Sequence, residues 1–188
     1  MTNPQPQEGV SGRKIIYDEN GKPCRSCNTL LDFRFATGKI TGKQAASAAA
    51  AAAAAAASTP AGSLGPTATE KIPGSKTHEK GEPLDVEGLG RSSWNVLHTI
   101  TANYPDKPSN SQQSEMRQFL QLFSHIYPCS WCASDFERYL KTHAPKLGSR
   151  DEFGRWMCEA HNEVNAKLNK ETFDCNFWEK RWKDGWDD

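Results

Sequence analysis

The segment Tyr127-Pro128-Cys129-Ser130-Trp131-Cys132 places two cysteines three positions apart, directly after a proline. It lies between two runs that are both typical of amphipathic helices. A proline ends the helix before it and can open the next one, so we expect this cysteine pair at a helix start. Free backbone N–H groups and the helix dipole stabilise a thiolate there, and the thiolate is the reactive form in disulfide exchange. The segment therefore predicts a redox-active disulfide.

The whole-chain composition excludes some function classes. The 188 residues include 23 basic and 23 acidic side chains, a balance that disfavours nucleic acid as the main partner. No apolar run is long enough to span a membrane. The first ten residues have neither a basic region nor an apolar core, so we expect no secretory signal, and they do not resemble a mitochondrial presequence.

The aromatic residues divide the chain into two parts. All six tryptophans and six of the eight phenylalanines follow Leu84, which predicts a folded domain at 84–188. Residues 1–83 are expected to form a flexible arm that ends in a low-complexity linker. An alanine run at 48–57 favours a short isolated helix. As a flexible coil, the roughly 60 residues after Cys27 would span about 40–45 Å, so the arm could move over the domain surface.

The folded part is predicted to be an all-α bundle of four helices plus a short fifth one, since no segment alternates like a strand. Ser109 with Gln112 and Ser149 with Glu152 match the capping-box pattern at two helix starts. The predicted helices cover about 85–103, 109–127 and 129–140, a fourth from Ser149 to about Leu168, and a last short one that carries Cys175 and Trp182.

The two cysteines of the central pair are expected to differ in environment. Cys132 shares one side of its helix with Phe136, Tyr139 and Leu140, which predicts that it points toward the core. Cys129 is then nearer the rim. This arrangement would suit one cysteine facing a buried electron acceptor and one facing incoming thiols.

The other four cysteines form two further pairs. Cys158 and Cys175 close a loop of 18 residues between aromatic neighbours, which favours a structural disulfide worth roughly 3 kcal/mol. Cys24 and Cys27 form a second C-x-x-C, interpreted as an exposed shuttle dithiol on the arm. The alternative is a four-cysteine zinc site built from both C-x-x-C pairs, although such pairs normally lie much closer in sequence.

A net thiol oxidase also needs an electron acceptor, because cysteines alone only exchange disulfides. A flavin accepts two electrons and is the natural choice. The chain has no G-x-G-x-x-G and no βαβ pattern, which excludes a Rossmann flavin site. Flat and polar side chains on the helices are compatible with a planar ligand, although each is also explained by a structural role. These are Trp94, His98, Tyr104, His161, Asn162, Asn165 and Trp182.

The sequence resembles the Erv/ALR family of FAD-linked sulfhydryl oxidases across essentially all of 84–188. The matching segments are LGRSSWNVLH (89–98), YPCSWC (127–132), WMCEAHNEVN (156–165), FDC (173–175) and RWKDGW (181–186). The arm motif KPCRSC (22–27) is similar to the mitochondrial intermembrane-space branch, that of the augmenter of liver regeneration. The alanine run matches no motif of the family.

The resemblance implies a FAD-binding helical bundle that forms a homodimer. By this likeness Cys132 lies against the flavin as a charge-transfer thiolate, and Cys129 is attacked by the shuttle pair. Cys24 and Cys27 would take electrons from the import oxidoreductase, a disulfide carrier of the intermembrane space. The final acceptors would be cytochrome c or oxygen, the latter giving hydrogen peroxide. The implied FAD contacts are Arg91, Trp94, His98, Tyr104, His161, Asn162, Asn165, Lys167, Lys170 and Trp182.

Two other function classes remain open from the sequence. One is a non-catalytic, zinc-binding interaction module with a flexible arm. The other is a flavin-free disulfide isomerase. Both would be colourless, and only the first would contain zinc.

Overall fold

The computed structural model describes residues 7–41, 44, 71–75, 77–78 and 80–186. Within these ranges it is helical, contains only isolated bridges and no strand, and confirms the all-α prediction. The chain divides into two compact units, 1–87 and 88–188. The predicted helix in the alanine run lies outside the described residues. None of the described helices has the length and apolar character needed to cross a membrane.

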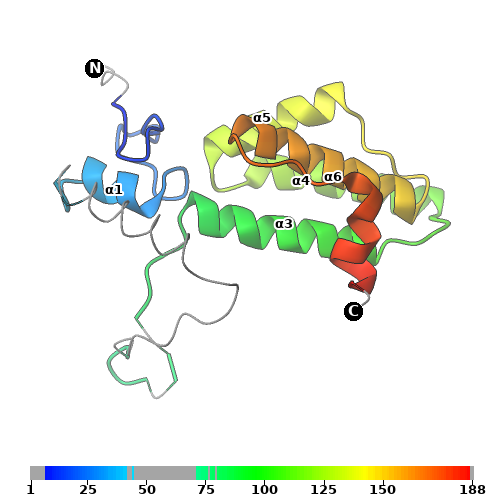
Figure 1. Ribbon diagram of the computed structural model, residues 1–188, viewed down its shortest axis with the longest axis horizontal. Helices are drawn as coiled ribbons and strands as arrows, with labels where there is room; N and C mark the ends of the chain where they lie inside the picture. Colours follow the sequence, from blue (N-terminus) through cyan, green and yellow to red (C-terminus); the bar gives the residue numbers. More distant parts are fainter. Residues whose placement is uncertain (1–6, 42–43, 45–70, 76, 79, 187–188) are drawn as a thin grey trace. The chain divides into compact units, whose positions relative to one another are not determined.

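The C-terminal unit is a bundle of four helices followed by two short helical turns (Figure 1). The predicted helix ends differ from the observed ones by at most two residues. The predicted fifth helix is instead split into a 3-10 turn and a π-type turn. The elements are α3 (Val86–Ala102), α4 (Asn110–Ile126), α5 (Ser130–Thr142), α6 (Arg150–Lys167), η1 (Cys175–Phe177) and η2 (Lys180–Asp184).

Side-chain caps define where these helices begin. The Ser109 hydroxyl accepts a hydrogen bond from the Gln112 N–H, and the Ser109 N–H donates to the Gln112 side chain, which completes the predicted capping box. The Ser149 hydroxyl accepts the Glu152 N–H at the start of α6. Cys129 is the N-cap of α5, so the redox motif itself sets the start of that helix.

The core of the bundle lies between the facing sides of the helices. Leu97 of α3, Leu120 of α4 and Trp156 of α6 are all buried in it. Burying one large apolar side chain contributes about 1.5–3 kcal/mol, so this core fixes the positions of α3 and α6, which carry the candidate site. The remaining buried members are Tyr104, Leu147, Phe153 and Met157.

The N-terminal unit contains a helix that the sequence analysis did not predict. Residues Leu30–Ala36 form α1, capped by Thr29. Asp32 is only 2% exposed and accepts hydrogen bonds from the Ser11 N–H, the Ser11 hydroxyl and the Thr29 hydroxyl. The buried Asn28 side chain bonds the backbone of Ile16 and the carbonyl of Cys24. These polar contacts organise residues 7–36 around the first C-x-x-C pair.

The same unit includes the residues that lead into α3. Arg34 pairs with Glu82 at 2.6 Å, and the Leu30 N–H donates to Asp85 at 3.1 Å. The Val86 N–H donates to the Asn28 carbonyl at 3.3 Å. Residues 28–34 are thus bound to residues 82–86 within this unit.

Candidate functional site

The central cysteine pair forms a disulfide at the start of α5. The Cys129 sulfur accepts the Cys132 N–H at 3.2 Å. Cys129 has no exposed surface and Cys132 is half-buried, so the expectation that Cys132 is the inner cysteine is wrong. The reason is the cap: Cys129 lies in the turn between α4 and α5, which encloses it, whereas Cys132 lies on the first turn of the helix.

Two contacts join the residues that flank this disulfide to α3. Before the pair, the Tyr127 hydroxyl donates to the Ser93 hydroxyl at 3.1 Å. After it, Phe136 meets Trp94 edge-on with centroids 6.3 Å apart. Because residues four apart on a helix share one face, Phe136 and Cys132 lie on the same side of α5. The segment that carries the disulfide is therefore attached on both sides to α3, the helix that contains Trp94 and His98.

The ring cluster consists of Trp94, His98, His161 and Trp182, from α3, α6 and η2. Trp94 and His161 stack with centroids 4.2 Å apart, and His98 and Trp182 stack at 3.7 Å. A hydrogen bond of 3.0 Å between His98 Nε2 and His161 Nδ1 joins the two stacks. Four flat side chains from three elements thus form one continuous surface.

Both histidines of the cluster are neutral at pH 7. Burial lowers the pKa of His98 to about 3, helped by His161 and by the positive charge of Arg181. Burial also lowers the pKa of His161 to about 4, with smaller effects of Lys170 and Arg181. Since neither ring is charged, one nitrogen of the pair donates its proton and the other accepts it.

The cluster fits a planar heteroaromatic ligand such as an isoalloxazine. His98 Nδ1 is buried and has no hydrogen-bond partner among the described residues. Buried polar atoms are normally paired, so this nitrogen is an available hydrogen-bonding group for a bound molecule. The stacked rings of Trp94 and Trp182 supply the flat apolar walls that such a molecule needs.

Three residues implied as FAD contacts by the resemblance have protein partners in the structure. The Asn162 amide bonds both the N–H and the carbonyl of Phe173. Lys167 pairs with Asp135 at 2.9 Å. The Tyr104 hydroxyl donates to the Leu147 carbonyl inside the core, where burial raises the pKa of Tyr104. Of the remaining three, Asn165 is half-buried on α6, while Arg91 and Lys170 are exposed.

The structure joins the other four cysteines as two disulfides. Cys24 and Cys27 are bonded in the N-terminal unit, with Cys27 buried and Cys24 half-buried. Cys158 of α6 is bonded to Cys175 of η1 and is buried. The second of these disulfides attaches the C-terminal turns, which carry Trp182, to α6.

Sequence reasoning missed how the motif is positioned. The sequence analysis gave Ser93 and Tyr127 no role in positioning the motif, although their hydroxyls bond each other. Phe136 packs against the core as predicted and also contacts Trp94, which was not predicted. The spacing of four between Cys132 and Phe136 was a usable signal, whereas nothing in the sequence marked the hydroxyl pair.

These features define a class of thiol–disulfide redox proteins: a helical bundle, a C-x-x-C disulfide at a helix start, a cluster of flat rings, and a second C-x-x-C upstream. The chain belongs to the Erv1 / Alr family, whose sequence model matches residues 91–183. It is 60% identical to the mitochondrial FAD-linked sulfhydryl oxidase ERV1 of Saccharomyces cerevisiae, over 100% of this chain and 97% of that protein.

Other relatives agree with this assignment. The mitochondrial FAD-linked sulfhydryl oxidase erv1 of Schizosaccharomyces pombe is 37% identical over 89% of this chain and 90% of that protein. The crystal structure of the yeast Erv1 core is similar with a TM-score of 0.62 and 64% identity. It covers 63% of this chain and 100% of the crystallised chain.

Proposed function

We propose that this chain is a FAD-linked sulfhydryl oxidase that generates disulfides in protein thiols. The observation that carries the proposal is that the segment with the Cys129–Cys132 disulfide is attached to α3, which contains half of the ring cluster, by the Ser93–Tyr127 and Trp94–Phe136 contacts. The relatives that cover nearly the whole chain bear this name. A disulfide next to a site for a planar two-electron acceptor is the arrangement that net thiol oxidation requires.

FAD is the cofactor of this proposal, and when bound it accepts two electrons from the active-site dithiol. Trp94, His98, His161 and Trp182 form the walls that would hold its ring system. His98 Nδ1 offers a hydrogen bond, and the neutral state of both histidines keeps positive charge away from the walls. Arg91, Asn165 and Lys170 stay candidates for its polar parts.

The chain's own cysteines would pass the electrons in two exchanges. A substrate thiolate attacks the Cys24–Cys27 disulfide, and the resulting mixed disulfide is resolved by the second substrate thiol, which leaves the pair reduced and the substrate oxidised. One thiolate of the reduced pair then attacks Cys129 and releases Cys132 as a thiolate, and the other thiol of the pair resolves the mixed disulfide, which re-forms the Cys24–Cys27 disulfide and leaves Cys129 reduced. The start of α5 stabilises the Cys132 thiolate through its free N–H groups and dipole.

Because Cys129 is buried, the shuttle pair cannot reach it without a movement of the chain. The order of attack comes from the family resemblance, whereas Cys132 is the more exposed sulfur here. Attack on Cys129 therefore requires that the turn between α4 and α5 moves first.

The relatives are named as mitochondrial enzymes, which supports a mitochondrial location for this chain. We propose a mitochondrial protein of the intermembrane space that supports oxidative protein import and folding. Its thiol donor would be the import oxidoreductase acting as disulfide carrier. Cytochrome c or oxygen would take the electrons, with hydrogen peroxide as the product from oxygen.

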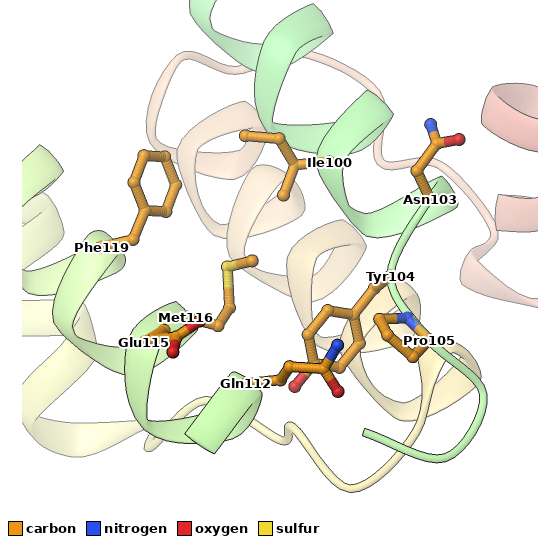
Figure 2. A pocket seen from close by; sticks show the side chains of 8 residues that line it. All are labelled: Ile100, Asn103, Tyr104, Pro105, Gln112, Glu115, Met116 and Phe119. Carbon is orange, nitrogen blue, oxygen red and sulfur yellow. The ribbon is translucent and has the colours of Figure 1, made fainter. Parts of the chain in front are cut away.

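A homodimer is part of the proposal, and an apolar groove supports it. Figure 2 shows this groove, of about 450 Å³, between the end of α3 and the first half of α4. Ile100, Met116 and Phe119 line it, and Val96 nearby is 55% exposed. Sedimentation should show a dimer for the wild type and a monomer for Val96→Glu if this surface joins two copies.

The first test is the visible absorption spectrum before and after dithiothreitol is added without air. A flavin band that bleaches on reduction would support the oxidase. A colourless protein with stoichiometric zinc would instead support the interaction module, and a colourless protein without zinc or oxygen consumption would support the isomerase.

A further inference from the structure

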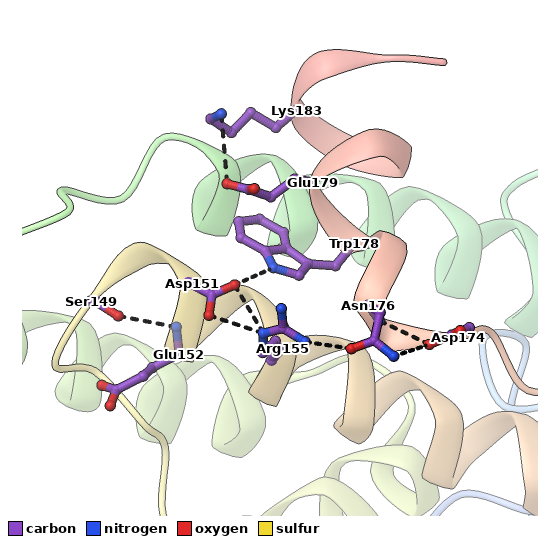
Figure 3. Close-up of polar contacts among 9 residues, drawn as sticks. All are labelled: Ser149, Asp151, Glu152, Arg155, Asp174, Asn176, Trp178, Glu179 and Lys183. Carbon is purple, nitrogen blue, oxygen red and sulfur yellow. Dashed lines mark hydrogen bonds and ion pairs between the residues drawn. The ribbon is translucent and has the colours of Figure 1, made fainter. Parts of the chain in front are cut away.

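The C-terminal turns are attached to α6 through Trp178 (Figure 3). Its indole is 1% exposed, and its Nε1–H donates to Asp151 at 2.9 Å. A Cβ placed on Gly154 would come within 2.5 Å of three atoms of this indole. Gly154 therefore provides the space in which the ring lies directly against the backbone of α6.

Asp151 is itself held in place by its neighbours. Arg155 Nε donates to both of its carboxylate oxygens at 2.9 Å, and Arg155 Nη1 donates to the Asn176 side chain. The Asn176 N–H in turn donates to Asp174 at 2.9 Å. The Trp178 N–H lowers the pKa of Asp151, with a further contribution from Arg155. This network binds the residues on both sides of Cys175 to the first two turns of α6.

Trp178 is the only buried residue in 176–186. Trp182 follows four positions later along a helical segment, so it lies about one turn beyond Trp178. Trp182 stacks on His98 and meets Phe173 edge-on at 5.2 Å, but η2 contains no buried residue. The Cys158–Cys175 disulfide ends seven positions before Trp182 and cannot fix the intervening residues.

We propose that Trp178, held by Asp151, is a positioning residue that sets the place of Trp182 in the ring cluster and thereby the affinity for FAD. The inference rests on the proposed function, because it takes the ring cluster as the FAD site. Trp178 acts on the cofactor only through Trp182. Its loss should therefore weaken FAD retention more than an equally destabilising change within α6.

The decisive variant is Trp178→Phe, which keeps an aromatic ring and removes the N–H donor. Trp156→Phe is the matched control: Trp156, on α6, is likewise 1% exposed and donates its Nε1–H to the His143 carbonyl at 3.2 Å. The dissociation constant of FAD is measured by diluting each holoprotein and recording the fluorescence of released flavin. We expect a rise of about tenfold for Trp178→Phe, the equivalent of one lost hydrogen bond to a charged group, and less than about twofold for the control.

Trypsin cleavage at Lys180, Arg181 and Lys183 gives a second readout that does not depend on flavin. Trp178→Phe should be cleaved there faster than the wild type and the control, and saturating FAD should slow the cleavage. Gly154→Ala, which places a methyl group where the indole lies, displaces Trp178 without changing it and should have the same two effects. It replaces Trp178→Phe in both measurements if Trp178→Phe folds poorly.

The inference would be overturned if Trp178→Phe and Trp156→Phe had equal dissociation constants for FAD. It would also be overturned if trypsin cleaved Trp178→Phe and Gly154→Ala no faster than the wild type. A wild-type protein that retains no FAD would overturn the proposed function instead. The cleavage assay would then still decide whether Trp178 anchors η2.

Discussion

The imidazole of His98 and the indole of Trp182 lie parallel, with planes 5° apart and centroids separated by 3.7 Å. His98 is on α3 and has no exposed surface, whereas Trp182 is in the last described turn of the chain. Their stack, extended by the hydrogen bond between His98 and His161, connects three elements. The candidate cofactor site therefore depends on the C-terminal turns being in place.

Replacing Trp182 with leucine should release flavin. The change removes the stack on His98 and the edge contact with Phe173, and aromatic pairs contribute about 0.5–1.5 kcal/mol each beyond their buried area. We expect a clearly lower flavin-to-protein absorbance ratio after gel filtration. Trp186→Leu is the control, since Trp186 is 56% exposed and contacts Phe177 rather than the cluster. Equal flavin loss in both variants would argue against a role for the stack.

Acidification should destabilise the protein through His98. Its pKa is about 3 in the folded state against an ordinary value of 6.5, so between these values the unfolded state binds more protons. Stability is therefore lost as the pH falls below 6.5, by on the order of 2 kcal/mol at pH 5 from this group alone. Urea unfolding at pH 7 and pH 5 measures the loss, and His98→Gln should reduce it. An unchanged loss in His98→Gln would assign the pH dependence to other groups.

Much of the bundle could be predicted because local signals agree with it. Ser109 and Gln112 mark a helix start by their own chemistry, and Pro128 marks the end of one helix and the start of another. The apolar stripes at spacings of three and four place Leu97, Leu120 and Trp156 in the core, where the structure has them. These features depend on near neighbours in the sequence, so the sequence contains them directly.

The remaining features depend on distant pairs. Asp32 is a buried carboxylate because Ser11 and Thr29 supply its donors, and a sequence pattern cannot show that residues 21 positions apart will meet. The Trp178–Asp151 contact is of the same kind. The burial order of the redox pair was missed because helix periodicity does not describe an N-cap residue such as Cys129, which lies outside the regular turns.

Variants of the two C-x-x-C pairs should differ in which substrates they can still oxidise. Cys132→Ser removes the thiolate next to the ring cluster and should abolish flavin reduction by any thiol. Cys24→Ser should leave turnover of dithiothreitol intact and block turnover of a reduced protein substrate. Oxygen consumption with each substrate measures both effects. Wild-type turnover of the protein substrate by Cys24→Ser would show that the N-terminal pair is not the shuttle.

Removing the Tyr127 hydroxyl should slow thiol-dependent flavin reduction without loss of flavin. Tyr127→Phe removes the hydrogen bond to Ser93 that holds the residues just before Cys129 in place. Such a bond contributes about 1 kcal/mol, which corresponds to roughly a fivefold lower rate. Stopped-flow absorbance with dithiothreitol measures the rate. Tyr104→Phe, which loses a bond to the Leu147 carbonyl, is the control and should lower stability by a similar amount at an unchanged rate. Flavin loss in that control would place Tyr104 at the cofactor.

Replacing Asp32 with alanine should disable the N-terminal unit while leaving the bundle active. The change removes the acceptor of the Ser11 N–H and of the Ser11 and Thr29 hydroxyls, and a hydrogen bond to a charged group contributes about 1.5–3 kcal/mol. We expect lost turnover of a reduced protein substrate, normal turnover of dithiothreitol, and faster proteolysis within residues 7–41. Asp18→Ala is the matched control, because the Asp18 carboxylate is exposed and accepts the N–H groups of its near neighbours Asn20 and Lys22. If Asp32→Ala oxidises the protein substrate at the wild-type rate, the fold around Cys24 and Cys27 is not needed to present them, and the pair works as a simple tethered dithiol.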